Sequence, residues 1–367
     1  MPADPRRPAW AEVDLAAIAH NVGELRRVSA PAAVWAVVKA DGYGHGSVEV
    51  ARAALDAGAA GLCVALVSEA AELRGAGIDA PVLLLSEPPL DAVAEAVALD
   101  LRLTVYRAET ARAISAAGGG RLHVKVDTGM HRVGVAPHDL AALVTEIGAA
   151  PDLQLEGLWT HFALADAPDD PFTAEQISIF DAATCGLSVP MVHLANSAAA
   201  LTVPDARRSL VRCGIAMYGI APSAAIAQRA SVDLRPALTL KARVSMVQRL
   251  KETSGVSYGR RRSLRPGTVV ATVPIGYADG VPRRWFDTGG EVLIGGRRRP
   301  LAGVVTMDQL LVDCGDDESV AVDDEVVLIG RQGRAAISAT EWADRLGTIA
   351  YEVTCAISAR VPRVYVR

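Results

Sequence analysis

Cysteine is scarce in this chain of 367 residues, which has five cysteines, scattered and without a C-x-x-C pair. An odd, dispersed set argues against a disulfide framework and a zinc site, and it is typical of a protein in a reducing cytosol. The chain also lacks a charge-free apolar run long enough to span a bilayer. Residues 1–10 lack the apolar core of a secretory signal. We therefore expect a cytoplasmic protein with no metal and no membrane partner.

The chain has little excess charge of either sign. Its 37 basic and 42 acidic residues give a net charge of -5, so there is no electrostatic footprint for a nucleic acid. We interpret one basic run, at 259–265, as a solvated turn. Hydrophobic residues make up 51% of the chain, enough for a large core. The length favours two domains, or one large barrel with a smaller module.

The first two thirds of the chain repeat one theme, in which short β-rich runs alternate with Ala-rich stretches of helical periodicity. Such alternation predicts parallel β-α units. Eight runs favour a (β/α)8 TIM-like barrel over 9–230, with an open doubly wound sheet as the alternative. The eight runs are 34–39, 61–66, 81–86, 101–106, 123–128, 155–161, 191–197 and 211–219.

The pattern changes near residue 231, where strand-like runs rich in Gly and Pro replace the helical segments. Only 338–347 keeps a helical appearance. This predicts a C-terminal, mostly antiparallel β domain over 231–367. The segment 8–15 could donate a strand to either domain, including this second one.

Unlike polar residues gather where the predicted barrel strands end. Catalytic groups of such barrels lie at the C-terminal ends of the strands, and alternate residues face inward. Any one of these residues alone is more often a paired, capping or core residue. Their joint placement predicts a site. The residues are Lys39, His123, Lys125, Asp127, Arg132, His161, Asn196, Ser197 and Arg212.

Lys39 interrupts an otherwise apolar strand, and three glycines follow it within 42–46. A lysine desolvated there lowers its pKa, and a neutral amine is a nucleophile suited to a Schiff base. The glycines let the backbone approach a ligand, and Tyr43 adds a hydroxyl.

Late strands of such barrels often bind a phosphate, and Ser197 with the amides near Gly214 and Ile215 could do so. A lysine, a phosphate site and a barrel together indicate pyridoxal 5′-phosphate (PLP).

The segment 36–46, AVVKADGYGHG, resembles the PLP-attachment segment of alanine racemases almost residue for residue. Further segments resemble motifs of the same family in the same order, and they span both predicted domains. They are 125–134, 160–166, 193–199, 211–219, 256–260, 275–283, 305–309 and 351–353.

The resemblance implies a role for each matching residue. Lys39 would hold PLP and act as the base on one face of the substrate, and Tyr258 would act on the opposite face. The family is a head-to-tail homodimer in which this tyrosine comes from the partner subunit. The implied cofactor contacts are Tyr43, Ser197, Gly214, Ile215 and Tyr351 at the phosphate, and Arg212 with His161 at the pyridine nitrogen. The implied substrate contacts are Arg132, Met307, Tyr277 and Asp308.

Three positions need separate comment. Period-2 counting turns Lys125 inward near Arg132, and in many family members the matching lysine is carbamylated, so we predict a carbamate here. Val304 stands where family members often have an arginine along the substrate path, and Thr306 where they have a cysteine. We expect a less cationic path.

The resemblance implies an alanine racemase that supplies D-alanine for bacterial peptidoglycan. A broad-specificity or serine racemase of the same fold is the closest alternative, because one added hydroxyl is poorly rejected by an apolar pocket. PLP-dependent decarboxylases share the barrel, but the Tyr258 motif speaks against them. PLP-carrier proteins share it too, but they lack a second domain.

Overall fold

A computed structural model describes residues 7–367, and residues 1–6, where the sequence predicts no secretory signal, lie outside the described part. Two compact units are formed. The barrel unit contains 16–43 and 47–236, and the β unit contains 7–15, 44–46 and 237–367. Within the described part, no helix combines the length and the apolar character needed to cross a membrane.

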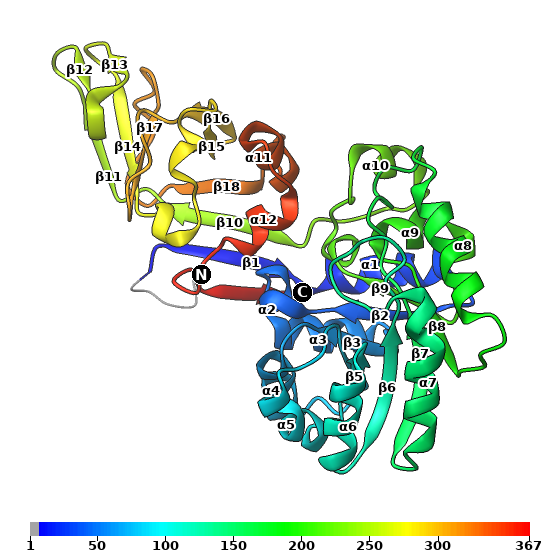
Figure 1. Ribbon diagram of the computed structural model, residues 1–367. Coiled ribbons are helices and arrows are strands. Elements are labelled where there is room, and N and C mark those ends of the chain that lie inside the picture. The colour runs from blue at the N-terminus through cyan, green and yellow to red at the C-terminus, as the bar shows by residue number, and fades with distance from the viewer. Residues whose placement is uncertain (1–6) are drawn as a thin grey trace. The chain divides into compact units, whose positions relative to one another are not determined.

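The barrel unit is built on eight parallel strands in the order β8-β7-β6-β5-β4-β3-β2-β9. The edge strands β8 and β9 are joined by hydrogen bonds from Ser209 N to Val192 O and from Arg212 N to Ala195 O, so the sheet is a nearly closed barrel (Figure 1). The predicted fold class is confirmed, and the open-sheet alternative is wrong. The strands are β2 Ala33–Val37, β3 Gly61–Val64, β4 Val82–Leu84, β5 Arg102–Val105, β6 Gly120–Lys125, β7 Leu153–Trp159, β8 Met191–His193 and β9 Leu210–Cys213.

Helices connect these strands, as the periodicity predicts. In α7, for example, Leu140, Leu143 and Ile147 are buried at the spacing of one helical face. The longer helices of the barrel unit are α1 Leu15–Ser29, α3 Ser47–Asp56, α4 Val67–Gly75, α5 Val93–Ala98, α6 Ala108–Ala116, α7 Leu140–Ala149, α8 Phe172–Thr184, α9 Ser197–Thr202 and α10 Ala224–Arg229.

All eight predicted strands end earlier than the sequence indicated, and two of these ends bear directly on the candidate site. β2 stops at Val37, and Lys39 begins the short element α2 (Lys39–Tyr43), whose next residues have φ between 50° and 59°. Such left-handed backbone is costly outside glycine. β9 stops at Cys213, and a 3₁₀ turn, η4 (Ile215–Tyr218), follows it.

The β unit is mostly antiparallel. Its largest sheet runs β16-β15-β18-β10-β1-β20, with β19 beside β18, and smaller sheets are β11-β14-β17 and β12-β13. β1 (Ala9–Asp14), within the early segment 8–15, pairs with β10 and β20. The other elements are β10 Leu238–Arg243, β11 Met246–Arg249, β12 Ser254–Gly255, β13 Ser263–Leu264, β14 Val269–Val273, β15 Glu291–Ile294, β16 Arg297–Pro300, β17 Leu310–Asp313, β18 Glu325–Gln332, β19 Ala335–Ile337, β20 Arg363–Val366, α11 Ala339–Leu346 and α12 Ala350–Cys355.

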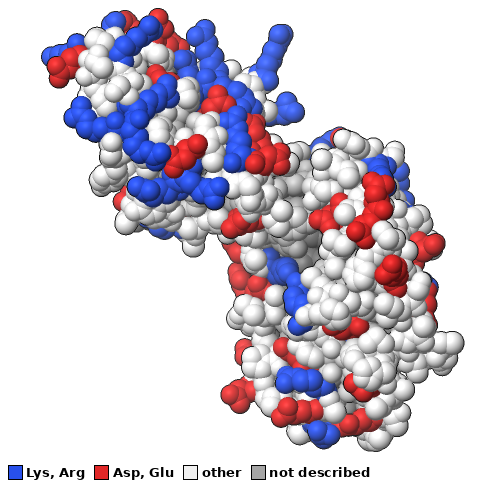
Figure 2. Space-filling view, turned by 45° about the horizontal axis from the view of Figure 1, so that its top comes forward, with Lys and Arg blue, Asp and Glu red and all other residues white. Residues whose placement is uncertain are grey.

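The basic run 259–265 lies on the β unit, where Lys and Arg are dense on the surface shown in Figure 2. Arg261 pairs with Asp287 at 2.6 Å, and Arg262 pairs with Asp313 at 2.5 Å. These charges have partners on their own unit, which supports a solvated turn over a polyanion site.

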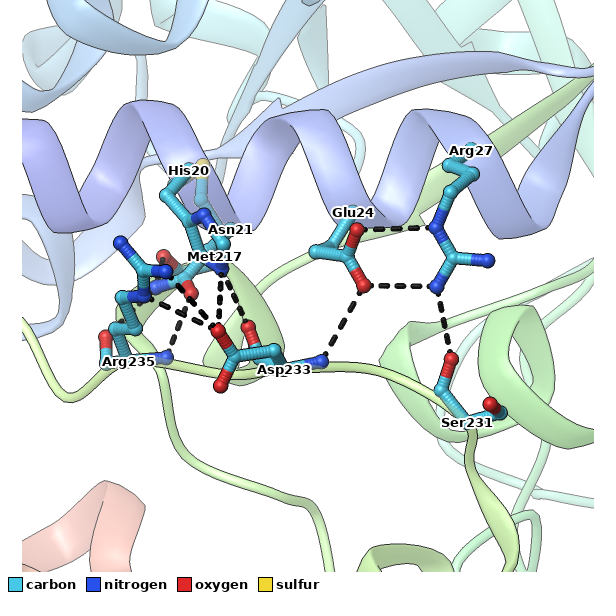
Figure 3. Close-up of polar contacts among 8 residues, drawn as sticks. All are labelled: His20, Asn21, Glu24, Arg27, Met217, Ser231, Asp233 and Arg235. Carbon is cyan, nitrogen blue, oxygen red and sulfur yellow. Dashed lines mark hydrogen bonds and ion pairs between the residues drawn. The ribbon is translucent and has the colours of Figure 1, made fainter.

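The segment that leaves the barrel is fixed to α1 (Figure 3). Asn21 is fully buried; its amide nitrogen donates to Met217 O at 3.0 Å and Arg235 O at 2.8 Å, and its oxygen accepts from Arg235 N at 2.8 Å. The exposed pair Arg27–Glu24 continues the contact one helical turn further, because Arg27 also donates to Ser231 O at 2.8 Å.

We expect Asn21→Ala to lower the free energy of unfolding by about 1–3 kcal/mol, because it leaves buried backbone groups without partners. Urea denaturation measures the change. Glu24→Ala on the same helix is the control; its exposed ion pair should matter clearly less. Equal losses in the two variants would contradict the assigned role of Asn21.

Candidate active site

The structure places the predicted site residues in two groups. The barrel unit carries Lys39, Tyr43, Lys125, Arg132, His161, Ser197, Arg212, Gly214 and Ile215 at or just beyond the C-terminal ends of its strands. The β unit carries Tyr258, Tyr277, Met307, Asp308 and Tyr351.

Arg212 is the centre of the barrel group. Its side chain is buried, with the residue 3% exposed, and Nη1 donates to His193 Nδ1 at 2.6 Å and His193 O at 3.0 Å. Nη2 donates to Thr160 O at 2.8 Å and Leu194 O at 3.1 Å, and lies 3.3 Å from His161 Nδ1. Burial lowers the pKa of Arg212 to about 10, so the guanidinium stays charged at neutral pH.

The two histidines beside Arg212 are neutral at pH 7. Burial, and then the charge of Arg212, hold the pKa of both His161 and His193 well below the usual histidine value. The barrel therefore surrounds one permanent cation with neutral acceptors, and none of the contacts above joins it to a carboxylate.

Lys125 is a second buried cationic group, and it lies near the first. Its Nζ is 4.8 Å from the ring centre of Trp159, and the guanidinium carbon of Arg212 is 4.6 Å from the same ring. Burial, followed by repulsion from Arg132 and Arg212, lowers the pKa of Lys125 to about 7. The lysine amine is thus substantially neutral at physiological pH.

Arg132 is carried by the turn after β6. The carboxylate of Asp127 accepts hydrogen bonds from Gly129 N and His131 N, both at 3.0 Å. At the end of the turn, Val135 N donates to Lys125 O at 2.8 Å. Asp127 therefore shapes the turn that holds Arg132 beyond the strand end.

A small polar cradle lies at the starts of α9 and η4. Ser197 Oγ accepts from Gly214 N at 2.9 Å and from Ala216 N at 3.4 Å. The Tyr43 ring packs against that of Tyr218 at a tilt of 31°, with ring centres 4.9 Å apart, and Tyr218 donates to Val37 O at 3.0 Å. A Cβ at residue 214 would come within 2.4 Å of Tyr43 Oη, so glycine makes room for this hydroxyl.

The β-unit group is presented by two adjoining turns. Tyr277 N donates to Thr306 O, and Ala278 N to Met307 O, both at 3.0 Å. Thr306 Oγ1 closes its own turn by donating to Gln309 O at 2.8 Å, and Arg360 pairs with Asp308 at 2.7 Å. Tyr277 is 41% exposed and Met307 is 53% exposed.

Tyr258 is 70% exposed, more than either Met307 or Tyr277. Its loop is nevertheless fixed, because Ser257 Oγ donates to Val304 O at 2.6 Å and Val256 packs in a small core cluster. Val304 itself is 2% exposed. Tyr351 is half-buried on α12.

Sequence reasoning missed His193, which contacts Arg212 directly, and Glu156, which is joined to His193 through His123. His193 Nε2 lies 2.8 Å from His123 Nδ1, and His123 Nε2 lies 2.9 Å from a Glu156 oxygen. The signal for His193 was present, because it is an inward position of the strand that precedes Ser197. Glu156 gave no such signal, since alternation along 155–161 turns it outward.

We expect Gly214→Ala to destabilise the apoprotein by about 1–3 kcal/mol, because the added methyl group collides with Tyr43. Gly23→Ala is the control. Gly23 is exposed within α1 with nothing within 4 Å of its added Cβ, so alanine should stabilise by about 0.5–1 kcal/mol. Thermal unfolding of both variants measures this, and a Gly214→Ala protein as stable as the parent would contradict the close approach.

The chain is similar to known proteins along both units. The model of the alanine racemase N-terminal domain matches residues 13–222, and that of the C-terminal domain matches 237–365. An alanine racemase of Symbiobacterium thermophilum is 45% identical, with all of this chain and 99% of the relative aligned.

Solved structures extend the similarity to the fold. The alanine racemase of E. faecalis superposes with a TM-score of 0.94 at 38% identity and covers 100% of each chain. That of Bacillus anthracis, solved with bound L-Ala-P, has a TM-score of 0.93 at 39% identity over 100% of this chain and 96% of its own. The chain therefore belongs to the alanine racemase family.

Proposed function

We propose that this protein interconverts L- and D-alanine with PLP as its cofactor, and that Lys39 and Tyr258 are the two bases. The observation that carries the proposal is the barrel rim. Arg212, which is buried among neutral acceptors, lies on β9, and β9 leads into the cradle formed by Ser197 and Gly214. Lys39 follows β2, the strand that pairs with β9.

The residues present suit each part of this cofactor. Its phosphate needs hydroxyl and amide donors, which Tyr43, Ser197, Gly214 and Ile215 can supply, and the missing Cβ at 214 makes room there for the Tyr43 hydroxyl. Its aldehyde needs a primary amine, which Lys39 provides. When bound, PLP supplies an electron sink that acidifies the α-proton of an attached amino acid. Tyr351 is the further phosphate contact that we propose.

Arg212 is suited to the ring nitrogen of this cofactor. The barrel carbonyls and histidines described above occupy its Nη hydrogens, so Nε–H is the donor that they leave for a ligand. An arginine donates and does not give up its proton. The nitrogen it meets is therefore kept unprotonated, with His161 beside it.

Racemisation needs one proton removed from one face of the α-carbon and another delivered to the opposite face. We propose that the Lys39 amine serves one face and the Tyr258 hydroxyl the other. The exposure of Tyr258 on its own chain supports a head-to-tail homodimer in which it completes the partner's site. Arg132, Met307, Tyr277 and Asp308 are the proposed substrate contacts.

We expect Lys39→Ala to lose at least about 10³-fold of the alanine racemisation rate, since it removes both a base and the anchor of the cofactor. Tyr258→Phe should abolish racemisation while NMR in D₂O still shows exchange of the α-proton for one enantiomer. Exchange of both enantiomers in Tyr258→Phe would refute the two-base assignment. Tyr106→Phe, a tyrosine of the barrel unit, is the control.

We also propose that Lys125 is carbamylated. The reaction needs a neutral amine, and the carbamate turns one of several neighbouring cations into an anion. ¹³C NMR with labelled CO₂ should show the carbamate above pH 7 and its loss as the pH falls through the lysine pKa of about 7.

Lys241 is the control for this labelling, because it pairs with Glu12 and Glu325 and its pKa is raised despite burial. Labelling of Lys241 but not of Lys125 would contradict the proposal.

In a bacterial cytoplasm, the D-alanine formed would supply peptidoglycan precursors. A broad-specificity or serine racemase remains the alternative, and a panel of L-alanine, L-serine, L-lysine and L-arginine decides between them. We expect kcat/KM for alanine to lead the others by about tenfold or more. Equal values for alanine and serine would favour the alternative.

A further inference from the structure

A continuous chain of polar side chains crosses the barrel interior behind Arg212. It runs from Arg212 Nη1 to His193 Nδ1 (2.6 Å), from His193 Nε2 to His123 Nδ1 (2.8 Å), and from His123 Nε2 to Glu156 Oε2 (2.9 Å). Arg102 closes the far end, with Nε 3.5 Å from the same carboxylate. Both histidines are fully buried. Four strands, β9, β8, β6 and β7, contribute the chain from Arg212 to Glu156, and β5 adds Arg102.

The two ends give this chain a direction. Arg212 can only donate, and an ionised Glu156 can only accept. Each neutral histidine between them offers one donor and one acceptor. A single assignment satisfies every contact: His193 accepts at Nδ1 and donates from Nε2, and His123 does the same. Both rings are therefore neutral Nε2–H tautomers.

The backbone is shaped to build this chain. Leu122 of β6 pairs with Leu155 of β7, but His123 pairs with Gly157, so Glu156 is the extra residue of a β-bulge. Bulges re-aim side chains, and this one brings the Glu156 carboxylate to the His123 ring. A Cβ at residue 157 would come within 2.4 Å of His123 Nδ1, so glycine clears the space that the ring needs.

We infer that Glu156, His123 and His193 are positioning residues that act through one directed chain of hydrogen bonds to hold the Arg212 guanidinium in place. This inference rests on the proposed function only in assigning Arg212 to the cofactor ring nitrogen. The chain itself is a property of the protein alone.

The arrangement has two consequences for Arg212. Nη1 of Arg212 faces the lone pair on Nδ1 of His193. The opposite tautomer of His193 would place a ring N–H against an N–H of the guanidinium. Its charge is also not cancelled by direct contact with a carboxylate, because Glu156 is two histidines away. Burial favours the charge-neutral form of Glu156, but the hydrogen bond from His123 and the nearby arginines Arg102 and Arg121 outweigh it and lower the Glu156 pKa.

The tautomers are tested by long-range ¹H–¹⁵N NMR on apoprotein labelled at histidine, at pH 7, with His193→Asn and His123→Gln variants to assign the signals. We expect both rings to be neutral, with Nε2 protonated and Nδ1 not. A ring that carries its proton on Nδ1, or on both nitrogens, would overturn the directed chain without bearing on the enzyme activity.

The positioning role is tested by titrating PLP into apoprotein and measuring its Kd by absorbance. Glu156→Leu removes the terminal acceptor and should weaken PLP binding on the order of tenfold, whereas Glu156→Gln keeps an acceptor oxygen and should restore most of it. Glu146→Leu is the control: it removes from α7 an exposed carboxylate that pairs with Arg112, and it should leave the Kd of PLP unchanged. Circular dichroism confirms that each variant is folded.

The double variant gives the sharpest result. His193→Asn keeps an oxygen near the Nδ1 position for Arg212 but ends the chain there, so Glu156→Leu should add little to its effect on Kd. Additive losses would mean that Glu156 does not act through His193, and they would refute the inference. An Arg212→Leu variant with unchanged Kd would instead refute the proposed contact between Arg212 and the cofactor.

Discussion

The burial of one arginine cation inside the barrel is the constraint on which the rest of the site depends. A charge taken out of water must be met by hydrogen bonds, and Arg212 is met by three backbone carbonyls and two neutral histidines instead of a carboxylate. Because no carboxylate among these contacts neutralises it, the positive charge of Arg212 can act on a ligand at the barrel rim. Burial is the main cause that shifts the pKa of His161, His193 and Lys125 toward neutrality, and repulsion from the charge of Arg212 adds to it.

Each functional element of the barrel unit is then fixed by an ordinary local device. The Ser197 hydroxyl ties the starts of α9 and η4 together, Asp127 shapes the turn before Arg132, and a glycine at 214 admits Tyr43. The β unit uses the same kind of device, in which paired turns present Tyr277 and Met307. Each unit thus presents its candidate residues on short, separately anchored segments, which is an arrangement that holds side chains within narrow limits.

The sequence predicted the barrel because its signals are local: alternation, helical periodicity and strand ends are all read within a few residues. It also placed Lys39, Ser197 and Arg212 at strand ends for the same reason. It could not give the left-handed turn at 40–43, since Ala40 and Asp41 carry no glycine signal. It could not give Glu156 either, because a β-bulge breaks the period-2 count at that residue. Tyr258 followed only from the family resemblance, since the contacts of one chain leave it exposed.

The most direct test of this account is the protonation of the cofactor nitrogen that faces Arg212. Reconstituting the apoprotein with PLP labelled with ¹⁵N at the ring nitrogen allows its chemical shift to be read at pH 7. The account predicts the shift of an unprotonated pyridine nitrogen, because Arg212 donates a hydrogen bond and keeps its own proton. A pyridinium shift would show that a proton lies on the ring, and it would contradict the role of Arg212 from which the rest is derived.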